Sequence, residues 1–208
     1  ILCRCLDNPS ERHLQAADTL LSYLADTATY GITYGGDAAS SMPTQGGTRA
    51  VYSPLKEGME SMSDSDWATG HSISGFVIFM ALGAVMWASK KQPVTSLSST
   101  EAEYYAASAA GAEVLALRHF MRHVAPDSVV EPTPLHVDNS ACVDLAKDFN
   151  SCKRTKHIDR RVNFLTDYHK MGELTVSFIS TKENVADIFT KPLGKKLFGK
   201  HCQKLVHA

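Results

Sequence analysis

The stretch "SSTEAEYYAAS" (residues 98–108) opens a predicted helix over residues 100–124 and carries two glutamates two positions apart. Glu101 begins a face of this helix that is largely polar. Glu103 begins an apolar stripe, which predicts that its carboxylate points toward the core of the domain. The stripe consists of Ala107, Ala110, Val114, Leu117, Met121 and Val124.

Acidic residues at a helix start have an ordinary explanation, because they cap the helix. Two capping boxes fit the sequence, one pairing Ser98 with Glu101 and the other pairing Thr100 with Glu103. Taken by itself, Glu103 is more easily explained as a cap than as a catalyst. A carboxylate at the head of a core-facing stripe nevertheless requires a partner, since an unpaired buried charge is costly. Both interpretations therefore stay open.

The segments on either side of this helix predict one α/β domain. Upstream, a short strand at 59–68 precedes a hairpin of 73–80 with 84–89, and residues 93–98 can add a further strand. Meandering strands followed by βα units imply a mixed sheet with helices on its faces. The downstream elements are a strand at 134–138, helices at 140–149 and at 155–172 (ended by Gly172), a strand at 173–180, and a last helix at 182–191 that Pro192 stops.

The first fifty residues differ in composition from the rest. A helix is predicted from Ser10 to Ala28, and "YGGDAASSMPTQGGTRAVYSPLKEG" after it reads as a linker rich in Gly, Ser and Pro. We therefore expect a helical segment with a linker over 1–50, the α/β domain over 51–195 and a C-terminal tail over 196–208. Because the chain does not begin with Met, we also expect it to be a piece of a longer protein.

Composition excludes some classes of protein. A formal net charge of -1 argues against a chain that coats nucleic acid by bulk charge, although the cluster "KRTKHIDRR" (residues 153–161) can contact phosphates. No apolar run reaches the length of a membrane span. The five cysteines include no CxxC pair, which favours free thiols in a reducing compartment.

Three further acids stand at the ends of predicted elements and invite comparison with Glu103. Asp138 closes a strand, Asp64 lies beside Asp66 in the first strand, and Asp187 lies in the last helix. Each has an ordinary role, as an N-cap, a turn residue and an ion-pair partner within its helix. Gathered within about 4 Å, carboxylates repel by ~4 kcal/mol per pair at an effective dielectric near 20. A divalent cation such as Mg²⁺ or Mn²⁺ relieves that repulsion, and two such ions can cleave a phosphodiester.

Several ordered motifs resemble the ribonuclease H domain of copia-type LTR retrotransposon Pol polyproteins. They are "SDSDWA", "SGFVIF", "WASKKQPVTSLSSTEAEYYA", "LHVDNSA", "TKHID" and "VADIFTKPL". The segment "NPSERHLQAADTLLSYLADTATYGITY" is similar to the end of the reverse transcriptase that precedes that domain. The resemblance implies a five-stranded mixed sheet flanked by helices. It also implies hydrolysis of the RNA strand of RNA–DNA hybrids, with two Mg²⁺ or Mn²⁺ ions as cofactors.

The resemblance assigns the metal ligands to Asp64, Glu103, Asp138 and Asp187. Asp64, Glu103 and Asp138 would hold one ion, and Asp64 with Asp187 the other. The first strand is polar, so the choice of Asp64 over Asp66 stays open. The residues expected to contact nucleic acid are Ser65, Asp66, Lys90, Asn139, Ser140, Lys156 and Arg160.

Other features of the resemblance concern accessory residues and partners. The loop "STKENVA" lacks a histidine that many ribonucleases H carry, and Lys182 or Glu183 can take its place. His157 and Asp159 match the family, but we keep them outside the catalytic set. The implied partners are an RNA–DNA hybrid and the remainder of the reverse transcriptase polyprotein, with no membrane. The implied location is a cytoplasmic virus-like particle, the nucleus, or both.

Two alternatives remain at this point. The first is an inactive copy of the fold with a structural or nucleic-acid-binding role. The second is another two-metal enzyme on the same fold, such as an integrase or a Holliday-junction resolvase.

Overall fold

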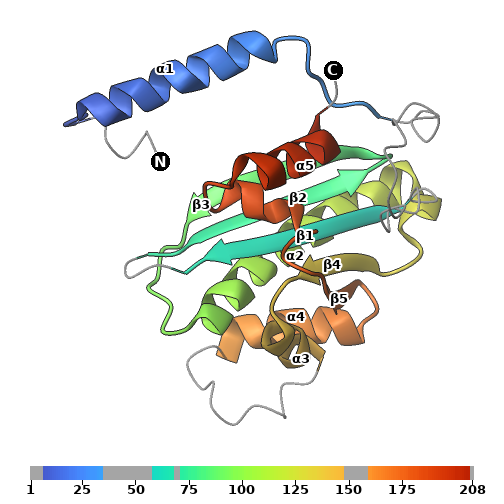
Figure 1. Ribbon diagram of the computed structural model, residues 1–208. Helices are drawn as coiled ribbons and strands as arrows, with labels where there is room; N and C mark the ends of the chain where they lie inside the picture. Colours follow the sequence, from blue (N-terminus) through green and yellow to red (C-terminus); the bar gives the residue numbers. More distant parts are fainter. Residues whose placement is uncertain (1–6, 35–57, 68–70, 148–158, 207–208) are drawn as a thin grey trace.

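A five-stranded mixed sheet forms the centre of the molecule (Figure 1), whose computed structural model describes residues 7–34, 58–67, 71–147 and 159–206. The strand order is β3-β2-β1-β4-β5. β1 pairs antiparallel with β2 and parallel with β4, so the sheet changes direction at β1. The strands are β1 (Met59–Asp66), β2 (Ile73–Met80), β3 (Gly83–Lys91), β4 (Thr133–Val137) and β5 (Leu174–Phe178). The predicted fold class is confirmed.

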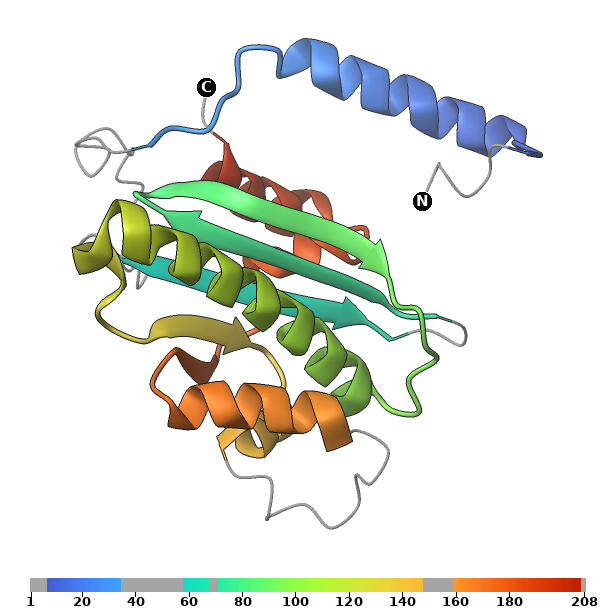
Figure 2. The same ribbon diagram turned by 180° about the vertical axis from the view of Figure 1, so that it is seen from behind.

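Helices cover both faces of this sheet. Figure 2 shows α2 (Ser99–Val124) running across one face, with α4 (Asp159–Lys170) beside it. Figure 1 shows α5 (Lys195–Leu205) on the opposite face. The remaining helical elements are α1 (Glu11–Asp26), α3 (Ser140–Lys147) and the short 3₁₀ segments η2 (Pro126–Val129) and η4 (Val185–Phe189).

Each face of the sheet has its own apolar core. Under α2, the core contains Ile78, Leu135 and Val137, which are fully buried. On the other face, Met62 and Val77 pack with Val185 of η4 in a smaller core. Alternation along each strand separates the two sets, as expected from the period of two. The central strand β1 contributes Met62 to the smaller core and is protected from solvent along most of its length.

The stripe on α2 behaves as predicted over most of its length. Ala107, Ala110 and Val114 are fully buried against the sheet. Val124 is 62% exposed, so its predicted burial is wrong. The reason is length, because 26 helical residues span about 39 Å while an eight-residue strand spans about 26 Å.

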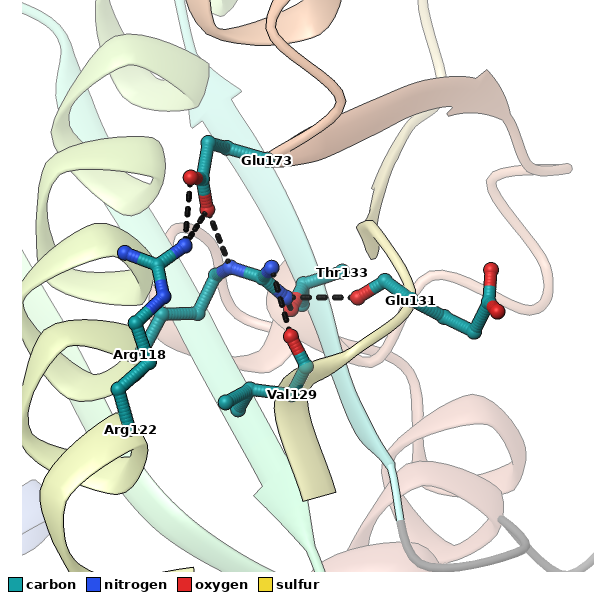
Figure 3. Close-up of polar contacts among 6 residues, drawn as sticks. All are labelled: Arg118, Arg122, Val129, Glu131, Thr133 and Glu173. Carbon is teal, nitrogen blue, oxygen red and sulfur yellow. Dashed lines mark hydrogen bonds and ion pairs between the residues drawn. The ribbon is translucent and has the colours of Figure 1, made fainter. Parts of the chain in front are cut away.

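The C-terminal half of α2 is fastened to the sheet by a buried arginine (Figure 3). Arg118 is 2% exposed, and its Nε lies 2.9 Å from Glu173 Oε2 in an ion pair. Arg122 also pairs with Glu173. The remaining donors of Arg118 reach Val129 O at 3.0 Å, Glu131 O at 2.8 Å and Thr133 Oγ1 at 2.9 Å. This arginine thus ties α2 to the segment that leads into β4 and to the residue that precedes β5.

Two features differ from the sequence expectations, and a third is tested only in part. Residues 93–98 form no strand, and β3 ends at Lys91. The predicted last helix is the 3₁₀ segment η4, and α5 follows it after Pro192. The start predicted for the helix at 155–172 falls outside the described residues, but its end is confirmed, since Gly172 has φ +72°.

The predicted N-terminal helix is confirmed as α1, but its apolar side chains are not part of a core. Leu14, Leu21 and Leu24 are more than half exposed. Contact with the rest of the molecule comes from Tyr23, whose ring packs edge-on against Phe198 of α5 at 5.8 Å between centroids. The helix is therefore attached to the domain through a face other than its leucine stripe.

Two further expectations concern cysteines and membranes. Cys142 and Cys202 are free thiols, as predicted, and the other three cysteines lie outside the described residues. In the part of the chain that the structure describes, no helix is both long and apolar enough to cross a membrane.

Candidate metal centre

Asp64 lies on the central strand and is almost completely buried. Its Oδ2 accepts a hydrogen bond from Thr190 Oγ1 and lies 3.6 Å from Lys191 Nζ. Gly75 pairs with Asp64 on the neighbouring strand, and a Cβ there would lie 2.7 Å from Thr190 Cγ2. The glycine therefore allows the end of η4 to approach the strand closely enough for its hydroxyl to reach Asp64.

The two glutamates at the start of α2 have different roles. Ser98 caps the helix, since its Oγ accepts from Glu101 N at 3.1 Å, and Glu101 Oε2 accepts from Leu97 N at 2.7 Å. Glu103 instead reaches across to β1, where its Oε1 accepts from Ser65 N at 3.2 Å. The alternative in which Thr100 and Glu103 form a capping box is therefore wrong, and Glu101 is the capping acid.

Asp138 follows β4 directly and is also free of a capping role. Asn139 Oδ1 accepts from Cys142 N at 3.1 Å and so caps α3 in its place. Asp187 lies in η4, where its Oδ1 is 3.1 Å from Lys191 Nζ. The predicted ion pair within this helical turn is present, but Asp187 is buried rather than on the surface.

Three of the four predicted acids meet at one point. Carboxylate oxygens of Asp64, Asp138 and Asp187 all lie within 4.8 Å of one another. They come from the central strand, from the residue after β4 and from η4, so the sheet order brings them together. Asp66 is not in this group, and the geometry therefore favours Asp64 as the first acid. We call these three aspartates together with Glu103 the acidic cluster.

The pKa values of the cluster reflect its burial and its mutual repulsion. Burial, together with the charges of Asp64 and Asp138, raises the pKa of Glu103 to about 9. Burial and the neighbouring Asp64 raise the pKa of Asp187 to about 7. Burial also raises the pKa of Asp138, although a hydrogen bond from Thr181 opposes the shift. The anionic form of these acids is thus disfavoured in the absence of a cation.

The donor set fits a hard divalent cation. Glu103 Oε2 and Asp187 Oδ2 are buried without a hydrogen-bond partner among the described residues, and Asp187 Oδ1 faces the ammonium group of Lys191. Lys191 supplies one positive charge, against four carboxylates, from a side chain that is one-third exposed. Carboxylate oxygens are the ligands that Mg²⁺ and Mn²⁺ prefer, and either ion would lower the raised pKa values.

The residues expected to contact nucleic acid are spread around this cluster. Ser65 is buried beside Glu103, and Asp66 is partly exposed at the end of β1. Ser140 is exposed at the start of α3, next to the capping Asn139. Lys90 is exposed on the edge strand β3. Lys156 falls outside the described residues, and of Arg160 the structure describes only the backbone, at the start of α4.

Sequence reasoning missed part of the surroundings of the cluster. Thr190 and Lys191 both contact Asp64, and the motif "VADIFTKPL" was the signal that contained them. Glu183 was considered as a substitute for a missing histidine. It is paired instead with Lys200 and Lys204 of α5, the latter at 3.3 Å, and these lysines lower the pKa of Glu183.

Comparison with known proteins shows that the chain is similar to transposon polyproteins. It is 30% identical over 210 residues to the retrovirus-related Pol polyprotein from transposon TNT 1-94 of Nicotiana tabacum, covering 99% of this chain and 14% of that protein. It is 28% identical to the corresponding polyprotein from transposon RE1 of Arabidopsis thaliana, covering 98% of this chain and 13% of that protein. The chain therefore spans about one seventh of the length of these relatives.

The chain is also similar to solved structures of RNase H domains. The N-terminal RNase H domain of Rv2228c from Mycobacterium tuberculosis matches with a TM-score of 0.49 and 10% identity, over 70% of this chain and 96% of that one. No family model matches the chain.

Proposed function

We propose that this chain, which is similar over 98–99% of its length to retrovirus-related Pol polyproteins of transposons, is a ribonuclease H that hydrolyses the RNA strand of RNA–DNA hybrids. The single observation that carries the proposal is the convergence of Asp64, Asp138 and Asp187 on one point, with buried Glu103 beside them. A buried all-oxygen donor set is costly to assemble, and phosphodiester hydrolysis by divalent ions is the chemistry that uses it.

In the proposed mechanism, Asp64, Glu103 and Asp138 would hold one divalent ion, and Asp64 with Asp187 the second. Bound ions lower the pKa of a water and stabilise negative charge on the phosphate. The water oxygen attacks phosphorus and the bond from phosphorus to the 3′ oxygen breaks, which leaves a 3′-hydroxyl and a 5′-phosphate. No side chain of the protein serves as the nucleophile.

The chain's own residues orient the ligands in this mechanism. Thr190 donates to Asp64 Oδ2 and so fixes one carboxylate oxygen, leaving Oδ1 for a ligand role. The backbone N–H of Ser65 holds Oε1 of Glu103, and Asn139 leaves Asp138 free by capping α3. These contacts preorganise the donors, which favours catalysis because little reorganisation remains for the reaction itself.

The decisive experiment replaces Asp138 by Asn and measures Mg²⁺-dependent cleavage of an RNA–DNA hybrid. We expect cleavage to be abolished while the thermal unfolding temperature in EDTA stays within a few degrees of wild type, since Asp138 caps nothing. The matched control is Asp144→Asn, which changes an exposed acid of α3 and should cleave normally. Wild-type cleavage by Asp138→Asn would refute the site assignment. Duplex DNA and branched DNA, offered in parallel, test the integrase and resolvase alternatives.

One observation favours the second candidate, an inactive module with a structural or nucleic-acid-binding role. Lys191 already pairs with both Asp64 and Asp187, as expected for a cluster that no longer binds metal. The two candidates differ in their response to Mn²⁺. At one hundred times its Kd, an ion that binds only the folded state stabilises it by about 2.7 kcal/mol. An active site should therefore show a clear rise in unfolding temperature with Mn²⁺, lost in Asp138→Asn, and an inactive module should show neither.

A further inference from the structure

An exposed tryptophan lies directly after the strand that carries Asp64. Trp67 is 54% exposed, yet its indole is held in place, because Nε1 donates to Ser96 O at 3.2 Å. Leu97, the next residue after Ser96, is 76% exposed. Single exposed apolar side chains are common, whereas several in one region of the surface can form a contact site.

The anchor beneath Trp67 is a buried polar network. Ser96 Oγ donates to Gln92 Oε1 at 2.9 Å, and Gln92 Nε2 donates to Ser74 Oγ at 2.9 Å and to Ala102 O at 3.0 Å. Gln92 is only 1% exposed. Burying an amide costs free energy unless its N–H and C=O groups are hydrogen-bonded. The hydrogen bonds of Gln92 offset that cost and hold the loop in one position. This network rigidly positions the segment that carries Ser96 and Leu97.

The same network connects the tryptophan to the acidic cluster. Ala102 immediately precedes Glu103 in the first turn of α2, and Ser74 precedes Gly75, the partner of Asp64 in the sheet. Trp67 is three residues beyond Asp64, which is about 10 Å in an extended strand. Adjacent nucleotides of a duplex are about 3.4 Å apart along each strand. A nucleic acid whose phosphate meets the acids therefore passes within reach of the indole.

We propose that Trp67, together with Leu97 of the loop to which it is bonded, is an apolar contact for the sugar rings of an RNA–DNA hybrid, a few nucleotides from the scissile phosphate. This inference rests on the proposed function and deepens it. A duplex keeps its bases stacked inside, so what it offers a surface ring is the sugar face exposed in the wide, shallow minor groove. An aromatic ring can pack on that face with little sequence preference, as expected of an enzyme that must accept any hybrid.

The chain supplies its own control, because it contains only two tryptophans. Trp87 is 53% exposed, almost the same as Trp67. It lies on the edge strand β3 opposite Val77, two strands away from the strand that carries Asp64. A general effect of exposed indoles on binding would therefore be seen for both residues, whereas the proposed contact involves Trp67 alone.

Fluorescence gives the first test, in an Asp138→Asn background so that the hybrid is not cleaved. Trp87→Phe leaves Trp67 as the sole indole, and we expect its emission to change saturably with added hybrid. Trp67→Phe leaves Trp87, whose emission should stay constant. The reverse pattern, or equal changes in both proteins, would overturn the inference.

Affinity gives the second test in the same background. Trp67→Ala should weaken hybrid binding about tenfold, as expected for the loss of one buried apolar contact, and Trp67→Phe should retain most of the affinity. Trp87→Ala should bind within about twofold of its parent, a difference too small for a lost aromatic contact. Equal affinity of Trp67→Ala and its parent would overturn this inference and leave the nuclease proposal intact. Failure of every protein to bind hybrid would instead count against the proposed function itself.

Discussion

The two halves of α2 each bury a charged side chain, and the two environments are opposite. Arg118, near the C-terminal end, donates four hydrogen bonds to protein oxygens and pairs with Glu173. Glu103, near the N-terminal end, has one oxygen bonded to Ser65 and the other buried without a partner among the described residues. About 23 Å of helix separates them.

The pKa values of the carboxyl groups at the two ends of α2 shift in opposite directions. Burial raises the pKa of Glu173, but hydrogen bonds from Arg118 and Arg122 outweigh it, so the net shift is downward. At the other end, burial and neighbouring carboxylates raise the pKa of Glu103 to about 9. A network whose buried donors and acceptors are all hydrogen-bonded to one another stabilises the fold. A cluster that leaves buried oxygens unpaired is stabilised by something from outside, which in our proposal is a divalent ion.

The largest effect should come from breaking the satisfied network. Arg118→Met removes the cation and leaves three acceptor groups without their donor, so we expect a loss of about 3–5 kcal/mol in the free energy of unfolding, measured with urea. Arg122→Met is the control, because Arg122 is 43% exposed and has only one partner in common with Arg118, namely Glu173. It should cost less than about 1 kcal/mol. Equal losses of unfolding free energy in Arg118→Met and Arg122→Met would contradict the proposed importance of the buried network.

A substitution at the acidic end of α2 should raise the free energy of unfolding instead of lowering it. In EDTA at pH 7, Glu103→Gln removes a carboxyl group that is disfavoured as an anion, and we expect a gain of about 1–3 kcal/mol. A group whose pKa is raised on folding binds its proton more tightly in the folded state. The wild type should therefore lose stability as pH rises from about 5 toward 9 in EDTA.

The pH dependence separates the two ends. Glu173 has a lowered pKa, so its contribution is present above its unfolded pKa of 4.5 and is lost as pH falls below it. Glu103→Gln should flatten the slope between pH 5 and 9, and Glu173→Gln should leave that slope unchanged. An unchanged slope in Glu103→Gln would show that this carboxyl group is not the source of the destabilisation.

The smallest effect should come from the cap that leaves Asp138 free. Asn139→Ala removes the acceptor for Cys142 N, and we expect a loss of about 1 kcal/mol in the free energy of unfolding. Ser140→Ala, at the exposed first residue of α3, is the control and should change stability by less than about 0.5 kcal/mol. If Asn139→Ala costs nothing, Asp138 or another group caps the helix in its place.

Local patterns in the sequence determined much of this molecule. Runs of strand-forming residues predicted β2 and β4, and the period near 3.6 predicted α2 and the direction of Glu103 toward the sheet. Motif order predicted Asp138 and Asp187 as members of one site, and both lie in the acidic cluster. These features could be predicted because each depends on residues within a few positions of one another.

Only the tertiary structure decided which local alternatives applied. Asp64 and Asp66 lie on the same side of β1, and the approach of η4 over Gly75 selects Asp64. Lys200 and Lys204 form ion pairs with Glu183 because α5 folds back beside η4. No local sequence pattern predicted this packing. The acidic cluster itself exists because parallel pairing sets the end of β4 beside β1. Strand order and register join residues that are far apart in the chain, whereas periodicity carries information only about near neighbours.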